Sequence, residues 1–192
     1  MRKKVGQRQF TSASMRGYTL LELLLTVALL ASAVGFAVPT MSTMAERRQT
    51  MGAVERIYSE LQLARSAAVA TSQPVFMNIN SGTNWAMGVS DNSACDPVDN
   101  DPACSIPDVD GNNAITYRFS VADNDNVQID ANNAQIVFSS QRGTATPANI
   151  TVTSLGDAGY IVNIIVRPLG QIAICSPIAD PARHLTSYRE CA

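Results

Sequence analysis

One acidic side chain lies inside an apolar run near the start of the 192-residue chain. Glu22 is preceded by Tyr18, Thr19 and two leucines, and no charged residue occurs from Leu23 to Met44. A helix needs about 20 apolar residues to span the hydrocarbon core of a bilayer. A carboxylate at the centre of such a helix costs about 2.5–3.5 kcal/mol, and less near the membrane surface. Glu22 therefore needs a cationic partner, and this need is the strongest chemical signal in the sequence.

Four cysteines supply the next chemistry: Cys95, Cys104, Cys175 and Cys191. An even number of cysteines in an exported domain indicates two disulfides, for which three pairings exist. We expect the local pairing, Cys95 with Cys104 and Cys175 with Cys191, because it closes two short loops. A zinc site is the rival interpretation, but the sequence has no C-x-x-C pair and a single histidine, His184.

A loop rich in Asp, Asn and Pro covers residues 91–113 and holds a weak candidate for a calcium site. Its residues Asp108, Asp110 and Asn112 match part of an EF-hand loop, which needs D-x-[DN]-x-[DN]-G and a glutamate six residues after the glycine. Here Gly111 directly follows the second aspartate, and position 117 is a tyrosine. The spacing favours a solvated turn, and no cofactor other than this weak calcium candidate is expected.

No catalytic set is found among the residues. The sequence lacks a G-x-S-x-G elbow, a P-loop and an H-E-x-x-H helix. A Ser/His/Asp arrangement would depend on His184, which lies in a polar tail beside prolines. We therefore expect a protein that is not an enzyme.

The tail from residue 177 to residue 192 carries aromatic and cationic side chains, which are the usual means of contacting nucleic acid: Arg183, His184, Tyr188 and Arg189. The charge balance argues against that use. Without residues 1–17 the chain keeps nine basic and 16 acidic residues, whereas contacts to phosphate dominate the affinity for nucleic acids. DNA is therefore not expected as a partner.

The apolar run begins a long helix, which we predict from residue 18 to about residue 71. Its first half is apolar on all sides, so it belongs in lipid or inside an assembly. Pro39 removes one helical hydrogen bond and predicts a kink near Val38. In the second half, apolar side chains recur at helical spacing and predict one stripe that packs on a soluble domain: Val54, Ile57, Tyr58, Leu61, Ala64 and Ala68.

The rest of the chain predicts an antiparallel β domain. Short β-prone or alternating runs, separated by Gly, Asn and Asp, cover residues 75–79, 115–119, 127–129, 135–138, 149–154, 160–166 and 172–175. The nearly continuous β-branched run at 160–166 predicts a central strand, and Gly170 predicts a hairpin into the last strand. The expected fold class is α+β, with a long N-terminal helix packed on antiparallel β-sheets.

Three segments follow from these patterns: a basic leader over residues 1–17, a membrane or assembly half of the helix over 18–45, and a β-rich domain over 46–192. One alternative is a secretory signal peptide cut after Ala31-Ser32-Ala33, and another is a plain membrane anchor. Against the signal peptide, Glu22 would lie inside its apolar region, and basic residues continue to Arg16. The basic leader predicts a cytoplasmic N-terminus and a domain on the far side of the membrane.

Residues 16–39 resemble the N-terminus of type IV pilins and of the related type II secretion pseudopilins. The shared features are Gly17, an aromatic residue, Thr19, two leucines, Glu22, and an apolar helix with a proline, Pro39, at the matching place. The family usually has Phe where this chain has Tyr18. The resemblance implies cleavage after Gly17 by a prepilin peptidase and methylation of the new amine of Tyr18. It also implies that this amine pairs with Glu22 of a neighbouring subunit, which removes the cost of burying the carboxylate.

Four further stretches are similar to the FimT/GspH group of minor pilins and pseudopilins: residues 64–75, 84–91, 137–143 and 167–175. The fold of that group, a long helix on antiparallel sheets, agrees with the residue pattern. The resemblance implies a FimT-like minor pilin that contributes to assembly or priming of a type IV pilus. A GspH-like pseudopilin of a type II secretion system is the first alternative.

The second alternative is a DNA-binding minor pilin for DNA uptake in natural transformation. Some FimT-type proteins carry a G-R-x-R motif for this purpose, but here Gly170 is followed by Gln, Ile and Ala. The partners implied are other pilins or pseudopilins, the prepilin peptidase and the inner membrane. We expect a single-pass protein of the bacterial inner membrane with a periplasmic C-terminal domain, which then joins a pilus or pseudopilus.

Overall fold

The computed structural model of the protein describes residues 18–99, 103–107, 114–120 and 126–191; the side chains of residues 36–40, 107 and 114–118 lie outside the description. The chain divides into two compact units, Met1–Thr40 and Met41–Ala192. One helix, α1 (Leu20–Thr71), begins in the first unit and ends in the second. All strands of the described residues belong to the second unit.

Helix α1 has 52 residues and confirms the long helix predicted from the sequence. Thr19 caps its start, because the backbone N–H of Glu22 donates to Thr19 Oγ1 at 3.2 Å. This bond satisfies one of the donors that a helix start leaves without a partner. The helix stops before Ser72, whose φ of 56° is the left-handed conformation common just after a helix end. Pro39 lies inside α1, and the kink expected near Val38 stays a prediction.

Nine strands follow α1 in the described residues and form two antiparallel sheets. The five-stranded sheet has the order β3-β4-β2-β1-β6, and the four-stranded sheet has the order β5-β7-β8-β9. The α+β fold class predicted from the sequence is confirmed. The strand bounds are β1 (Val75–Asn80), β2 (Ala86–Ser90), β3 (Ser105–Pro107), β4 (Ala114–Ser120), β5 (Val127–Ala131), β6 (Gln135–Phe138), β7 (Ala148–Ser154), β8 (Ile161–Val166) and β9 (Ile172–Cys175).

The seven strands predicted from residue patterns are all present, and β8 lies between β7 and β9, as expected of a central strand. One expectation is wrong. The loop predicted over residues 91–113 contains β3, which pairs with β4 in the register Ser105 with Thr116 and Ile106 with Ile115. Three residues are too few to show an alternating pattern, so only the partner strand defines this element.

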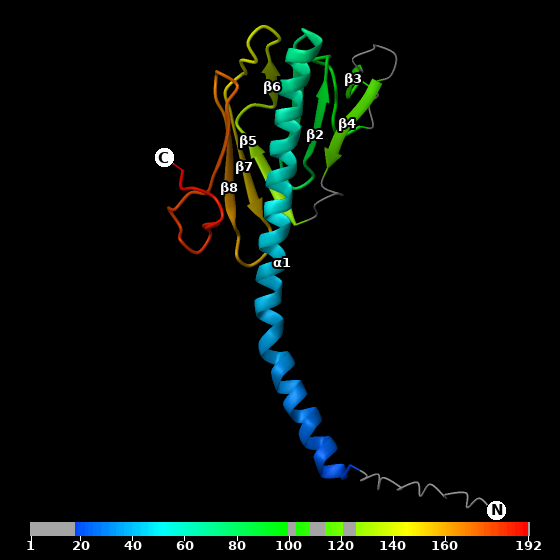
Figure 1. Cartoon of the computed structure of the whole chain (residues 1–192), viewed down its shortest axis with the longest axis vertical. Helices are drawn as coiled ribbons and strands as arrows, with labels where there is room; N and C mark the ends of the chain where they lie inside the picture. The colour runs from blue at the N-terminus through cyan, green and yellow to red at the C-terminus, as the bar shows by residue number, and fades with distance from the viewer. Residues whose placement is uncertain (1–17, 100–102, 108–113, 121–125, 192) are drawn as a thin grey trace, which may run out of the picture. The chain divides into compact units, whose positions relative to one another are not determined.

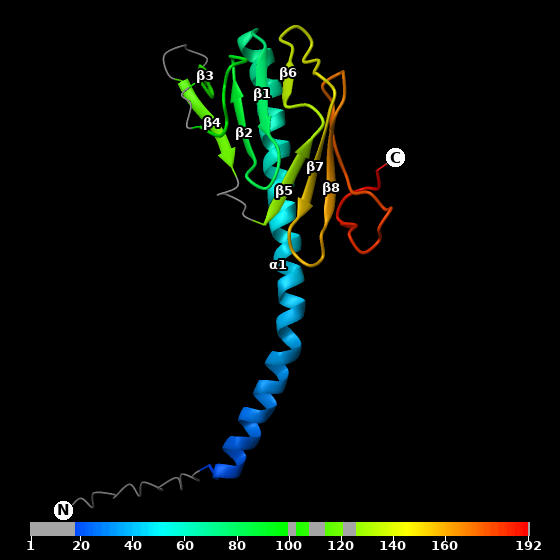
Figure 2. The same cartoon turned by 180° about the vertical axis from the view of Figure 1, so that it is seen from behind.

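Within the second unit, both sheets lie on the same side of α1, which passes in front of them in Figure 1 and behind them in Figure 2. The stripe of α1 that faces the sheets is fully buried and comprises Ala53, Val54, Ile57, Leu61, Ala64 and Ala68. Together with the inward side chains of the strands, it forms one hydrophobic core. The predicted stripe is therefore confirmed, except that Tyr58 is only half-buried at its edge.

The single tryptophan, Trp85, joins the two sheets. It directly precedes β2 of the five-stranded sheet and donates from Nε1 to the carbonyl oxygen of Val127, the first residue of β5, at 3.0 Å. Its buried ring meets Phe119 of β4 edge to face, with centroids 5.7 Å apart. The indole ring thus fills the junction of both sheets, and its N–H has a partner there.

Truncating a core side chain of α1 should cost stability, whereas the same truncation on the exposed face should not. Val54 is 0% exposed and Val69 is 54% exposed. We expect Val54→Ala to lower the free energy of unfolding by about 2–3 kcal/mol and Val69→Ala to change it by less than about 0.5 kcal/mol. Urea unfolding of the full-length protein in detergent, followed by Trp85 fluorescence, measures both. Equal losses would contradict the assigned face of α1.

Candidate assembly surface

The first unit presents an apolar helical surface on every side. The side chains described there, from Tyr18 to Gly35, are all exposed. The large apolar ones among them, Tyr18, Leu20, Leu21, Leu23, Leu24, Leu25, Val27, Leu29, Leu30 and Val34, are 55% to 83% exposed. A contiguous apolar surface of this kind marks an interaction site. Among the described residues, no helix combines the length and the apolarity that a membrane crossing needs.

Glu22 lies in the first turn of α1, three residues after the cap residue Thr19. Threonine at the cap followed by glutamate at this spacing is the pattern of a capping box, and the partial positive charge of a helix start favours a carboxylate. Within the described part of the chain, the one ion pair joins Arg56 and Glu60, so Glu22 has no cationic partner there. Two roles therefore remain for Glu22: a local helix cap, or an ion pair with another molecule.

Several residues predicted to be functional fall outside the described residues. Gly17, the predicted cleavage position, is one of them, so cleavage after Gly17 and methylation of Tyr18 stay predictions. The weak calcium candidates Asp108, Asp110 and Asn112 are also outside the described ranges.

The structure contains both disulfides of the local pairing, Cys95–Cys104 and Cys175–Cys191. The first closes the connection between β2 and β3 and lies directly against Gly88 of β2. A Cβ atom at position 88 would be 2.7 Å from the Sγ of Cys95, so only glycine permits this contact. The second ties the C-terminal segment, defined here as residues 177–191, to the end of β9.

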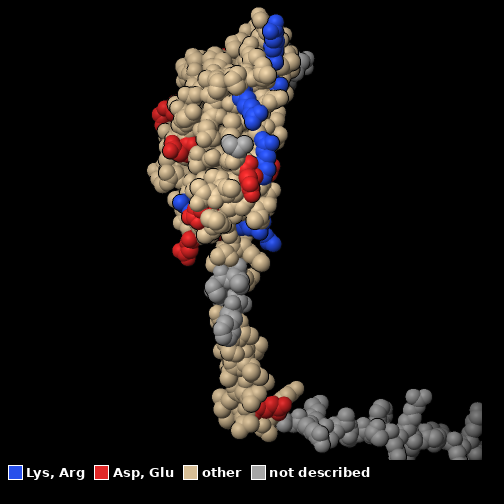
Figure 3. Space-filling model, turned by 90° about the vertical axis from the view of Figure 1, so that its left-hand side faces the viewer, with Lys and Arg blue, Asp and Glu red and all other residues tan. Residues whose placement is uncertain are grey.

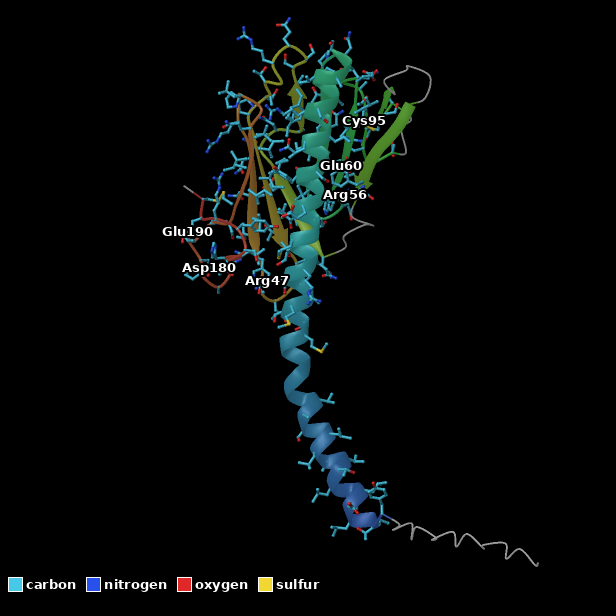
Figure 4. All side chains as sticks on the ribbon, in the orientation of Figure 1. Arg47, Arg56, Glu60, Cys95, Asp180 and Glu190 are labelled. Carbon is cyan, nitrogen blue, oxygen red and sulfur yellow. A yellow bond between two sulfur atoms is a disulfide. The ribbon has the colours of Figure 1, made fainter. Side chains whose placement is uncertain are left out.

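The C-terminal segment runs beside the four-stranded sheet and bonds to it through the backbone. Ile161 N–H donates to the carbonyl oxygen of Arg183 at 3.1 Å, and Ser176 N–H donates to that of Arg189 at 2.9 Å. Arg47 of α1 donates to Ser187 Oγ at 2.7 Å. Figure 4 shows Arg47 on the helix and labels Asp180 and Glu190 in the segment.

The four residues proposed for DNA contact lie in this segment. The side chains of Arg183, Tyr188 and Arg189 bond to the domain itself, whereas the buried Nδ1 of His184 has no hydrogen-bond partner among the described residues. Arg183 Nε donates to the carbonyl oxygen of Gly159 at 2.6 Å, and Arg189 Nε donates to that of Ile174 at 3.3 Å. His184 forms a parallel bridge with Ile161. The Tyr188 hydroxyl donates to Glu55 Oε1 on α1 at 3.2 Å. These contacts hold the segment against the fold.

Tyr188 titrates in an unusual environment because its hydroxyl contacts the Glu55 carboxylate. Burial of the ring, together with the charge and the hydrogen bond of the Glu55 carboxylate, raises the pKa of Tyr188 well above its ordinary value. Each of these causes disfavours the phenolate. The neutral hydroxyl therefore belongs to the folded state.

Glu46 is a buried carboxylate whose role the sequence analysis missed. It accepts hydrogen bonds from the Ser154 hydroxyl, from Ala158 N–H at 3.2 Å and from Gly159 N–H at 3.0 Å. A Cβ atom at Gly156 would lie 2.4 Å from its carboxyl group, so the β7–β8 loop closes directly over Glu46. The signal was present in the sequence, because Glu46 and Thr50 continue the buried stripe of α1 toward the N-terminus at helical spacing.

Residues 53–170 match the model of the family described as Type II transport protein GspH. The matched range includes most of the α1 segment that packs on the sheets, all strands from β1 to β8, and most of the β8–β9 turn. The chain belongs to the GspH family. It is a pilin-like protein of the minor pilin and pseudopilin group, and the family is one of structural pilins and not of enzymes.

No curated protein matches the GspH-family chain in sequence. Among solved structures it is similar to the type IV minor pilin FimU of Pseudomonas aeruginosa strain PAO1. The two sequences are 14% identical, the alignment covers 65% of this chain and 90% of that chain, and the TM-score is 0.46.

Removing the charge of Glu46 should loosen the β7–β8 loop of the GspH-family domain. Glu46→Gln keeps the shape but leaves one loop donor facing an NH₂ group, so we expect a loss of about 1.5–3 kcal/mol in the free energy of unfolding. Glu60→Gln removes a carboxylate from the Arg56 ion pair on the same helix and should cost less than about 0.5 kcal/mol. Urea unfolding compares the two variants. If Glu46→Gln loses no more unfolding free energy than Glu60→Gln, the assigned role of Glu46 is wrong.

The stability of the domain should fall in strong alkali because of Tyr188. Its pKa is raised in the folded state, so above about pH 10 the unfolded chain loses this proton while the folded chain keeps it. The contribution of the Tyr188 hydroxyl to the free energy of unfolding is complete below pH 10 and is lost as the pH rises further. We expect Tyr188→Phe to flatten the decline in unfolding free energy above pH 10. An unchanged slope would show that the hydroxyl is not held by Glu55.

Proposed function

We propose that this GspH-family protein is a FimT-like minor pilin that contributes to assembly or priming of a type IV pilus. One observation carries the proposal. An apolar surface covers the whole circumference of α1 up to Gly35, and it holds a single carboxylate, Glu22, beside the helix start. An apolar helix exposed on all sides is covered in its working state, by lipid or by other helices.

The proposal includes processing of the N-terminus. A prepilin peptidase removes residues 1–17, and the new amine of Tyr18 becomes methylated. The amine is then a cation close to the start of α1, at the level where Glu22 needs a partner. Because Glu22 of one subunit pairs with the amine of its neighbour, each added subunit neutralises one buried charge. Pro39 belongs to the helix that makes these contacts.

Before assembly, we propose, the protein crosses the bacterial inner membrane once, with its C-terminal domain in the periplasm. The absence of charged residues between Glu22 and Glu46 supports this location. The five basic residues of the leader support a cytoplasmic N-terminus. The helix then moves from lipid into the core of a pilus or pseudopilus without exposing its apolar surface to water.

A GspH-like pseudopilin of a type II secretion system is the second candidate function. The description of the matching family, Type II transport protein GspH, favours it. The two functions need the same helix, the same processing and the same ion pair, and they differ in the filament that receives the subunit.

DNA uptake is not favoured by the charges of the domain. Residues 46–192 contain nine arginines and no lysine against 15 acidic residues. A net negative domain repels a long polyanion, since contacts to phosphate dominate such binding. The cationic group of Arg183 also donates to a backbone carbonyl of the domain.

Two substitutions separate the local role of Glu22 from its role between subunits. Glu22→Gln keeps a residue that suits a capping box but removes the charge, whereas Thr19→Ala removes the cap and keeps the charge. We expect Glu22→Gln to reduce incorporation into sheared pili by at least about tenfold, because the neighbour's amine stays unpaired. Thr19→Ala should be incorporated nearly as well as the wild type. Immunoblots of sheared pili against whole cells provide the measurement.

Normal incorporation of Glu22→Gln together with a defect in Thr19→Ala would show that Glu22 serves as a cap, and the pairing proposal would then fail. If the wild-type protein is absent from pili and its deletion abolishes secretion instead, the pseudopilin function replaces the pilus function. Mass spectrometry of the same samples tests whether the mature chain begins at a methylated Tyr18.

A further inference from the structure

A groove of about 360 Å³ lies between α1, the β8–β9 turn and the C-terminal segment. Three arginines, one from each of these elements, line it: Arg65, Arg167 and Arg189. Gln62 and Gln171 add amide groups to the lining. Figure 3 shows several basic side chains along one edge of the domain, with acidic side chains among them. We call this feature the arginine groove.

The three guanidinium groups of the arginine groove form no ion pair within the described residues, where the one ion pair is that of Arg56 with Glu60. Glu190 lies outside the groove lining and shares an adjoining hollow of about 120 Å³ with Arg167 and Arg189. Three cations near one carboxylate leave a net positive charge, and like charges that converge repel one another. A guanidinium offers a rigid fork of donors that matches a carboxylate or phosphate in two parallel bonds. The groove is therefore arranged to receive an anion.

The arginine side chains of the groove are held in place before any ligand binds. Gly143 and Gly170 have positive φ values of 61° and 72°, and a Cβ atom on Gly170 would lie 1.8 Å from the carbonyl oxygen of Gly143. The same Cβ would lie 3.0 Å from Arg65 Nε. Gly143, between β6 and β7, and Gly170, in the β8–β9 turn, therefore let these two connections close around the Arg65 side chain. Arg189 is fixed by its backbone bond to Ser176 and by the neighbouring Cys175–Cys191 disulfide.

Exposed apolar side chains flank the arginine groove. Leu169, in the same turn as Arg167, is 69% exposed, and Val69 is 54% exposed. Val69 shares with Arg65 and Gln62 a second hollow on α1. Arginine beside apolar side chains is the composition of protein–protein interfaces. Three cations in an acidic domain are few for a polyanion, whose binding depends on many phosphate contacts.

We propose that the arginine groove binds a carboxylate-bearing polypeptide segment of a neighbouring subunit. The inference rests on the proposed function, because a filament brings such neighbours into contact. The carboxylates accept from the three guanidinium groups, and apolar side chains of the same segment cover Leu169 and Val69. The contact joins two different surfaces, so it is compatible with subunits that follow one another along a filament.

The test uses the full-length protein in a neutral detergent at low salt. The probe is a fluorescent peptide of alternating Asp and Leu, and binding is read by fluorescence anisotropy. We expect the wild type to bind it, and Arg167→Ala and Arg189→Ala each to weaken binding about tenfold, as the loss of a charge-assisted bond does. Arg48→Ala removes an exposed arginine of α1 outside the groove and should stay within about twofold of the wild type. Unchanged Trp85 fluorescence shows that each variant is folded.

Three outcomes would overturn the inference: no binding of the peptide, equal weakening by Arg48→Ala, or tighter binding of a labelled oligo-dT strand than of the peptide. The last would assign the groove to nucleic acid. The peptide assay needs no filament, so its failure is separate from failure of the proposed function. Normal incorporation of Glu22→Gln would refute the assembly mechanism and leave a positive peptide result standing.

Discussion

The burial of one stripe of α1 against two antiparallel sheets is the contact on which the rest of the domain depends. The two sheets share no ladder of strand pairs. Besides the helix, Trp85 and a two-bond backbone bridge between Gly82 and Ile129 hold them together. Small residues, Ala53, Ala64 and Ala68, lie toward the two ends of the stripe, and the larger Ile57 and Leu61 lie between them. Alanines let the helix approach the sheets closely, and the larger side chains fill the space between strands.

The buried stripe of α1 ends in polar side chains on its N-terminal side. Where the apolar side chains stop, Thr50 and then Glu46 occupy the buried face, and Glu46 accepts hydrogen bonds from the β7–β8 loop. Arg183 of the C-terminal segment donates to a carbonyl of that loop, and the segment in turn bonds to Arg47 and Glu55 of α1. The β7–β8 loop is therefore held by both α1 and the C-terminal segment. This explains how a long tail without regular secondary structure keeps a defined place.

The two units use one helix for opposite purposes. From Ala53 onward α1 has a buried face and an exposed face, and its buried face belongs to the core of its own domain. In the first unit the described side chains are exposed and, apart from Glu22 and a few hydroxyl groups, apolar, so no other described residue covers them. An exposed apolar surface of this size marks an interaction site, which agrees with the pilin-like family of the chain.

The sequence by itself determined the long helix, its buried stripe and the seven strands with an alternating or β-branched pattern, whereas the need of Glu22 for a cationic partner stays a prediction. These features depend on local periodicity and on the cost of burying a charge, which neighbours in the sequence already define. The local disulfide pairing was the expected one among three because short loops separate its cysteines. Strand β3 escaped because only its partner β4 defines it. The helical spacing of Glu46 marked the buried face, but the loop donors that it binds lie far away in the chain. Only the tertiary structure decided that Arg65, Arg167 and Arg189 meet in one groove, while Arg183 and Tyr188 hold the C-terminal segment in place. Long-range packing brings such side chains together, and no spacing in the sequence records it.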